Sequence, residues 1–239
     1  YAGAAWLPFA SAGVLFLAAI VLVTLIRPPP RAAVATGRSL KLIGEGLLYV
    51  LRNRIVLGAI SLDLFAVLLG GATALLPVYA RDVLHIGPDG LGHLRAAPAI
   101  GAVAVAIWLA SRPMRRNTGG WMFGGVAAFG AATIVFGLSE SFWLSMAALI
   151  VLGGGDMLSV YVRSSLIQLS TPDEMRGRVS AASSIFVSAS NELGEFRAGT
   201  MGAVIGAVPS VVAGGMAALG IAALWAWMFP ELRKADRLE

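Results

Sequence analysis

The sequence predicts an all-α membrane protein, and three observations lead to this fold class. The chain of 239 residues is 58% hydrophobic and only 13% charged, with a mean hydropathy of +0.81. A soluble domain is closer to half apolar and a quarter charged. The apolar residues gather in runs of about 20, the length that a helix needs to cross a bilayer. These runs lack the period-two alternation of barrel strands, so we expect helices.

Seven of these runs are predicted to span the membrane, at residues 6–26, 55–78, 91–111, 120–138, 142–169, 179–204 and 208–229. The first run has basic residues after it and none before it, which is the reverse of a signal peptide. We interpret residues 1–27 as the last helix of an amino-terminal half that is missing here. Residues 55–239 are then a six-helix carboxy-terminal half.

Residues 28–54 are predicted to be a cytoplasmic linker. Three prolines at 28–30 end the first helix, because proline cannot donate a backbone hydrogen bond. Beyond them, Leu40, Ile43, Leu47 and Val50 recur at helical spacing among charged residues. This pattern predicts an amphipathic helix on the cytoplasmic membrane surface.

Basic residues set the predicted orientation. Fourteen of the 18 Lys and Arg residues fall in alternate loops and at the carboxy terminus: Arg27, Arg31, Arg38, Lys41, Arg52, Arg54, Arg112, Arg115, Arg116, Arg176, Arg178, Arg233, Lys234 and Arg237. Loops rich in Lys and Arg stay on the cytoplasmic side. The carboxy terminus is therefore expected to be cytoplasmic. The net charge of +5 is explained by topology, and no nucleic-acid partner is predicted.

Six ionisable residues fall inside predicted spans and are the candidates for substrate binding or proton coupling: Asp63, Asp156, Arg163, Glu192, Glu195 and Arg197. Such residues usually face a bundle interior or a wet cavity, where they serve function or form structural ion pairs. The chain has no cysteine, which excludes disulfides and thiolate metal sites. No metal, cofactor or catalytic residue is predicted.

The depth of each residue along its helix suggests partners. Asp63 and Arg163 both lie about 10–13 Å from the cytoplasmic ends of their helices, so they are expected to pair if the helices are neighbours. Asp156 precedes Arg163 by two turns and shares its face. Glu192 and Glu195 lie one turn apart and repel when both are ionised, which favours protonation of one of them. Alternatively, Arg197 neutralises one of these two.

Three glycines precede Asp156, at 153–155, and we expect them to interrupt their helix near a binding site. Close helix packing is the other interpretation of these glycines. The four residues also match the GxGD signature of intramembrane aspartyl proteases. That reaction needs a second aspartate, and Asp63 is the one candidate in another predicted span, although it is expected to lie closer to the cytoplasm. A third alternative is a non-catalytic membrane subunit without a wet cavity.

Two motifs resemble the enterobactin-exporter branch of the major facilitator superfamily. Residues 171–179 (TPDEMRGRV) resemble its cytoplasmic signature between the fourth and fifth helices of the second half, and residues 76–84 (LPVYARDVL) resemble the end of its corresponding helix. Residues 190–199 and 229–233 are also similar to that branch. The sequence departs from the superfamily near Ser111, where an acidic residue often precedes the basic ones.

The resemblance implies alternating access, with substrate bound between two six-helix halves. The helices that carry Asp63, Asp156 and Arg163 would line the central cavity. A cytoplasmic gate is expected from inter-helix charge pairs, with simple retention of the loops inside as the alternative. The gate residues are Asp173, Glu174, Arg176, Arg178, Arg112, Arg115 and Arg116.

The leading hypothesis from sequence is therefore a proton-coupled exporter of small molecules, such as siderophores or drugs. Its expected location is the bacterial inner membrane. The expected partners are the lipid bilayer, a small-molecule substrate, protons and the amino-terminal half of the same transporter.

Overall fold

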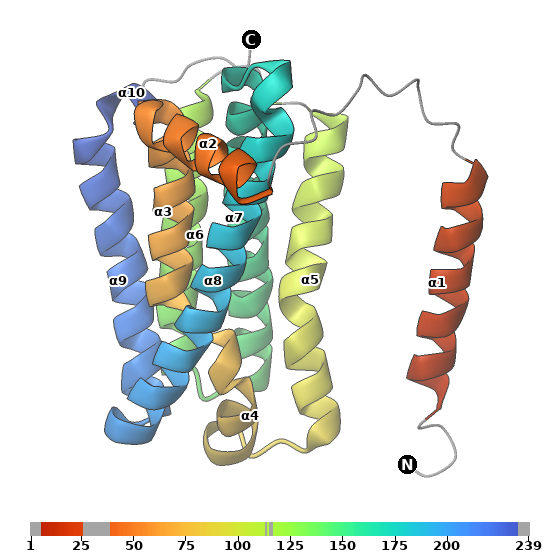
Figure 1. Cartoon of the computed structure of the whole chain (residues 1–239). Coiled ribbons are helices and arrows are strands. Elements are labelled where there is room, and N and C mark those ends of the chain that lie inside the picture. The colour runs from red at the N-terminus through yellow and green to blue at the C-terminus, as the bar shows by residue number, and fades with distance from the viewer. Residues whose placement is uncertain (1–5, 26–38, 113, 115–116, 234–239) are drawn as a thin grey trace. The chain divides into compact units, whose positions relative to one another are not determined.

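The computed structural model describes residues 6–25, 39–112, 114 and 117–233, and these residues form helices and short connections without strands. The all-α prediction is confirmed for this part of the chain. The chain divides into two units, Tyr1–Arg38 and Ser39–Glu239 (Figure 1). The triple proline and seven of the basic residues predicted to be cytoplasmic, Arg27, Arg31, Arg38, Arg115, Arg116, Lys234 and Arg237, lie outside the described residues.

The first unit contains one helix, α1 (Leu7–Leu25). Large apolar side chains are exposed all around it, including Phe9 and Phe16. A helix that is apolar on every side is stable only when lipid or other protein surrounds it. This agrees with the predicted first span.

The second unit is a bundle of long helices with a short helix across one end (Figure 1). Its elements are α2 (Ser39–Arg52), α3 (Arg54–Gly70), the 3-10 turn η1 (Thr73–Leu75), α4 (Leu76–Val78), the π-helical turn η2 (Tyr79–Val83), α5 (Pro88–Ser111), α6 (Thr118–Leu138), α7 (Phe142–Ser170), α8 (Asp173–Ile205), α9 (Ala207–Met228) and α10 (Pro230–Arg233).

Helix packing within this bundle follows from small residues at the crossings. Helix α7 packs against α5 and α6, α9 packs against α6 and α3, and α8 packs against α3. A Cβ at Gly130 would approach the Gly215 carbonyl oxygen to 3.0 Å, so α6 and α9 meet backbone to backbone. In lipid, this close packing replaces the hydrophobic drive that water gives to soluble bundles.

In the part of the chain that the structure describes, five helical segments are long and apolar enough to cross a membrane: Arg54–Val83, Pro88–Ser111, Thr118–Leu138, Phe142–Ser170 and Ala207–Met228. They correspond to the second through fifth predicted spans and the seventh. Helix α8 has 33 residues but is more polar, and the apolar stretch of α1, Phe9–Leu25, is shorter. Spanning by α1 and α8 stays a prediction.

Helix α2 is the predicted amphipathic linker helix, and it lies across one end of the bundle, which we call the α2 end (Figure 1). Within α2, the Val50 side chain is buried against the bundle, whereas Leu48 and Leu51 are exposed. Only Asn53 separates α2 from α3, and its side chain caps α3 by accepting hydrogen bonds from the Ile55 and Val56 amides. Helix α2 is thus joined to α3 through one capping residue.

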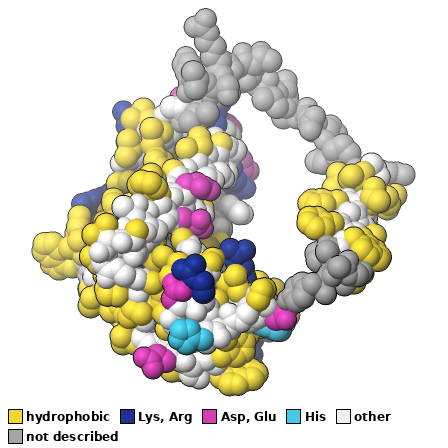
Figure 2. All heavy atoms as spheres, turned by 90° about the horizontal axis from the view of Figure 1, so that it is seen from below, with side chains coloured by type: hydrophobic (Ala, Val, Ile, Leu, Met, Phe, Trp, Pro, Cys, Tyr) yellow, Lys and Arg dark blue, Asp and Glu magenta, His cyan; other side chains and the backbone are white. Residues whose placement is uncertain are grey.

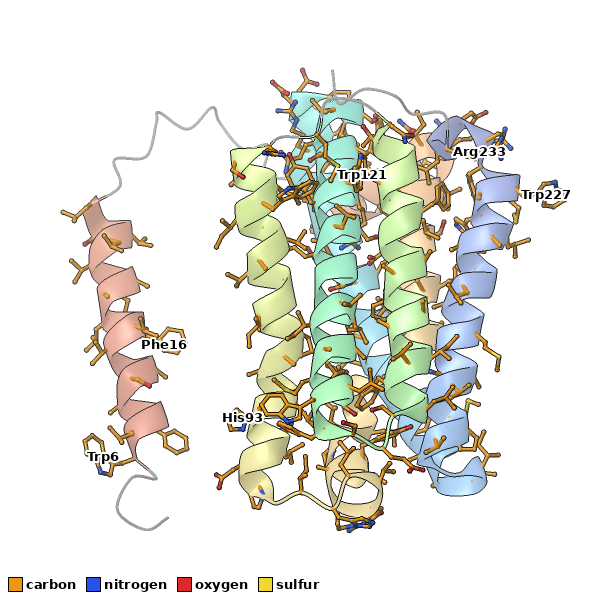
Figure 3. All side chains as sticks on the ribbon, turned by 180° about the vertical axis from the view of Figure 1, so that it is seen from behind. Trp6, Phe16, His93, Trp121, Trp227 and Arg233 are labelled. Carbon is orange, nitrogen blue, oxygen red and sulfur yellow. The ribbon has the colours of Figure 1, made fainter. Side chains whose placement is uncertain are left out.

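Aromatic and charged side chains gather at the two ends of the bundle. Trp121 and Trp227 lie near the α2 end, and Trp227 points away from the neighbouring helices (Figure 3) with 79% of its surface exposed. Tryptophan at this level is typical of a membrane interface. At the opposite end, which we call the α4 end, histidine, acidic and basic side chains lie among apolar ones (Figure 2).

Candidate functional site

Helix α7 carries Asp156 and Arg163, and it runs without a break from Phe142 to Ser170. The expected interruption at the three glycines before Asp156 is therefore wrong. A Cβ at Gly153 would lie 2.0 Å from the Pro98 carbonyl oxygen of α5, and one at Gly155 would lie 2.7 Å from the Gly125 carbonyl oxygen of α6. These glycines allow three helices to touch, and this contact fixes Asp156 within the bundle.

Asp63 of α3 and Arg163 of α7 form a buried ion pair. Arg163 Nη1 donates to Asp63 Oδ2 over 2.5 Å, and the two residues are 6% and 4% exposed. The pairing predicted from helix depth is confirmed. An isolated charge in such a buried site has a high free-energy cost. The two residues remain charged there because each neutralises the other.

Asp156 borders two cavities. The smaller has a volume of about 10 Å³, room for about one water molecule, and is also lined by Asp63 and Ser159. The larger has a volume of about 300 Å³ and reaches Thr73 beyond α3 and Asn191 of α8. Asp63 and Asp156 thus meet at one cavity, although their sequence positions suggested different depths. Asp63 is engaged with Arg163 rather than free to share a proton with Asp156, as an aspartyl protease would require.

The helix break occurs instead in the second predicted span, after Gly70. Helix α3 ends there, and the chain passes through Gly71 and Ala72 before η1 begins. Gly71 lies against the backbone of Gly194 on α8, where a Cβ would make contact at 3.4 Å. A broken helix at membrane depth leaves backbone carbonyls without intrahelical partners, and these need other donors.

Arg197 supplies one of these donors. Its Nε donates to the Leu68 carbonyl oxygen over 2.9 Å, which caps the carboxyl end of α3. Its Nη1 lies 3.0 Å from Met201 Sδ, and its Nη2 is buried without a hydrogen-bond partner in the described structure. Arg197 therefore supports the break in α3, and among the described ion pairs none joins it to Glu192 or Glu195.

Glu192 and Glu195 are exposed on α8, away from the Asp63–Arg163 pair. Glu195 borders a third cavity, of about 520 Å³, together with Thr73 and Arg95. Arg95 belongs to α5 and lies toward the amino-terminal end of that helix. Carboxylates on a helix that spans lipid need a polar partner or water, so we do not expect this face of α8 to contact lipid.

Two of the predicted gate residues, Arg176 and Arg178, form ion pairs, and one of these pairs joins two helices. Arg176 pairs with Asp173 of its own helix at 2.8 Å, and Glu174 is exposed. Arg178 pairs with Glu45 of α2 at 2.6 Å. The inter-helix pair at this end therefore joins α8 to the linker helix.

Further contacts hold α2 on the α7–α8 turn. The Tyr49 hydroxyl donates to the Ser170 carbonyl oxygen at the end of α7. A Cβ at Gly46 would lie 2.5 Å from the Arg178 carbonyl oxygen, so the two backbones touch. Of the other predicted gate residues, Arg112 is exposed at the end of α5, and Arg115 and Arg116 lie outside the described residues.

Comparison with protein families agrees with this architecture. A family model described as Major Facilitator Superfamily matches residues 1–195, well over half of the chain. The chain belongs to the major facilitator superfamily. No curated protein and no solved structure matches it. As a member of the superfamily, the chain is a multi-pass membrane protein of the transporter class. The cavities around Asp156 agree with this class better than with a subunit that lacks a wet cavity.

Proposed function

We propose that this major facilitator superfamily chain forms one wall of a proton-coupled exporter of small amphipathic molecules. The observation that carries the proposal is the position of Asp156. This carboxylate borders the cavity beside the Asp63–Arg163 pair and also the cavity of about 300 Å³ at the break in the second span. An ionisable group that contacts both a charge pair and a cavity at membrane depth is suited to proton coupling.

Asp156 takes up and releases the coupling proton in this proposal. When Asp156 is ionised, the site holds two carboxylates and one guanidinium, and protonation removes the excess negative charge. Because charge is costly at membrane depth, the protonation state biases which arrangement of the surrounding helices is stable. The break at Gly71 and Ala72 is the point at which the second span bends, and the Arg197 contact to Leu68 holds one arrangement.

The substrate site is completed, in this proposal, by a second six-helix half. Support comes from α8, where Glu192 and Glu195 are exposed at a depth that lipid does not tolerate well. Both belong to the substrate and proton pathway. The Arg178–Glu45 pair and the Arg176–Asp173 pair belong to a gate at the α2 end. We place that end in the cytoplasm of a bacterial cell, with the inner membrane as the location.

The enterobactin-exporter branch is the part of the superfamily that we favour. Its signature resembles residues 171–179, which include the gate residues Arg176 and Arg178. In the structure these residues contact α7 and α2, because Arg176 donates to the Gln168 carbonyl oxygen and Arg178 binds Glu45. The motif thus lies where α2, α7 and α8 meet, which supports a role in gating.

The test is proton-coupled transport by the full-length transporter in proteoliposomes, with ethidium and a catecholate siderophore as probes. Asp156→Asn and Glu192→Gln are each expected to lower the rate of proton-driven transport by about tenfold or more. Removal of a proton-transfer group lowers the rate of the step that it serves by at least this factor. Glu140→Gln is the matched control, because Glu140 is exposed in the connection between α6 and α7. Wild-type rates in both site variants would remove the assignment.

A further inference from the structure

A groove lined by serines lies between α7 and α8 toward the α2 end. Its volume is about 360 Å³, within the range of about 300–1,000 Å³ that small-molecule sites occupy. Five of its lining residues are Ser164, Ser180, Ser183, Ser184 and Ser188. The sequence pattern alone predicts no role for these serines.

The hydroxyl groups of these five serines form no hydrogen bond to any described residue of the protein. Other serines in the same bundle donate to a carbonyl oxygen of the preceding turn, as Ser61 does to Leu57 and Ser190 does to Val187. Such a bond satisfies a hydroxyl where water is scarce. The hydroxyl groups of the groove serines can therefore still donate and accept hydrogen bonds within the groove.

The spacing of these residues creates two facing rows. Ser180, Ser184 and Ser188 repeat every four residues on α8, and Ser164 and Gln168 repeat every four on α7. At 1.5 Å of rise per residue, neighbours in each row are about 6 Å apart. A molecule between the helices therefore meets hydrogen-bonding groups on both sides at regular intervals.

The charge of the groove selects against cations. Among the described residues that line it, Arg163 is the one ionisable group, and Asp63 balances its charge at 2.5 Å. The described lining of the groove includes no carboxylate, so a cationic ligand meets no counter-charge from it. An uncharged group with several hydroxyls matches the lining, because it exchanges hydrogen bonds with water for hydrogen bonds with serine.

We propose that this groove is a binding subsite for an uncharged, hydroxyl-bearing group of the transported molecule. The subsite lies on the same helix as Asp156, between that carboxylate and the α2 end. It rests on the transporter function proposed above and adds a substrate class to it. The other occupant to consider is protein: serines are small enough for a helix of a second half to pack on them.

Cysteine chemistry separates these occupants, because the chain has no cysteine of its own. Ser184→Cys and its neighbour Ile185→Cys are compared in the full-length transporter in liposomes, with a charged methanethiosulfonate reagent. Ile185 is 53% exposed on α8 but does not line the groove. The thiolate forms in water and not in lipid, so Ser184→Cys is expected to react on the order of tenfold faster. Equally slow reaction at both positions would mean that protein fills the groove and would overturn the proposal.

Ligand class is tested by protection of Ser184→Cys from the reagent. The uncharged probe 4-nitrophenyl glucoside is expected to slow labelling severalfold, and the cation ethidium is expected to leave it unchanged. Adding Ser180→Ala and Ser188→Ala is expected to raise the half-protecting glucoside concentration about tenfold, because two hydrogen bonds are lost. Ser165→Ala, on α7 outside the groove lining, is the matched control.

Two results would overturn the subsite: no protection by the glucoside, or protection by ethidium alone. These outcomes are distinct from failure of the proton-coupling proposal. Asp156→Asn tests the latter through transport, and it is expected to leave glucoside protection intact.

Discussion

Asp63 and Arg163 form a buried ion pair between α3 and α7. Each side chain is less than one-tenth exposed, and their polar atoms meet at 2.5 Å. In contrast, the pair of Arg54 and Glu231 lies at the surface, where both side chains remain largely exposed. Burial decides the energetic weight of a pair, because loss of one partner leaves the other charge without compensation.

Removal of one partner is therefore expected to destabilise the protein strongly. Asp63→Asn leaves Arg163 unpaired and should cost about 3–5 kcal/mol of unfolding free energy. Glu231→Gln, the control at the exposed pair, should cost about 1 kcal/mol or less. Thermal unfolding in detergent compares the two variants. A third variant, Asp63→Asn with Arg163→Met, should regain much of the lost stability, and equal melting temperatures for all three would contradict this account.

Glycine acts in two opposite ways in the helices of this bundle. In α7, the run before Asp156 remains helical and lets α5 and α6 approach, whereas at Gly70 and Gly71 the helix stops. The difference lies in the neighbours. A continuous helix at 153–155 is held between two touching backbones, whereas the break at Gly71 faces α8 and has its freed Leu68 carbonyl capped by Arg197.

Substitution of a packing glycine is expected to separate helices. A Cβ at Gly101 would lie 1.8 Å from the Ile150 carbonyl oxygen, so Gly101→Ala forces α5 and α7 apart. We expect a cost of about 1–3 kcal/mol, typical of overpacking, and a lower melting temperature. Gly124→Ala is the control, because no atom lies within 4 Å of its added Cβ. It should be neutral or slightly stabilising, since alanine favours helix; a similar loss in both variants would argue against the packing explanation.

The two ends of the bundle carry different elements and different charges. Helix α2, the α7–α8 turn and α10 gather at the α2 end, together with Arg176, Arg178 and Arg233 (Figures 1 and 3). The α4 end carries the connection between η2 and α5. The positive-inside tendency predicts that the α2 end is cytoplasmic.

Single cysteines test this orientation directly. Gly87 precedes α5 at the α4 end, and Gly177 lies in the first turns of α8; no atom is within 4 Å of an added Cβ at either position. Gly87→Cys is expected to react with a membrane-impermeant maleimide on intact cells. Gly177→Cys is expected to react only after the cells are permeabilised. The opposite pattern would reverse the assigned topology.

Composition and residue order predict a helical membrane protein, because hydrophobic content and the length of apolar runs depend on nothing else. The sequence also indicated the Asp63–Arg163 pair, since depth along a helix follows from residue count. The motif at 171–179 pointed to the superfamily that the family model matches.

Three features follow only from the packing of the helices: which glycine run breaks its helix, which partners Arg178 and Arg197 take, and where the free serine hydroxyls converge. Glycine permits both a break and a close approach, and only a neighbouring backbone selects between them. Long arginine side chains reach several possible acceptors within one helix or across two, so sequence spacing does not fix the partner. The serine groove arises because residues from two helices face each other, a relation that no single helical pattern contains.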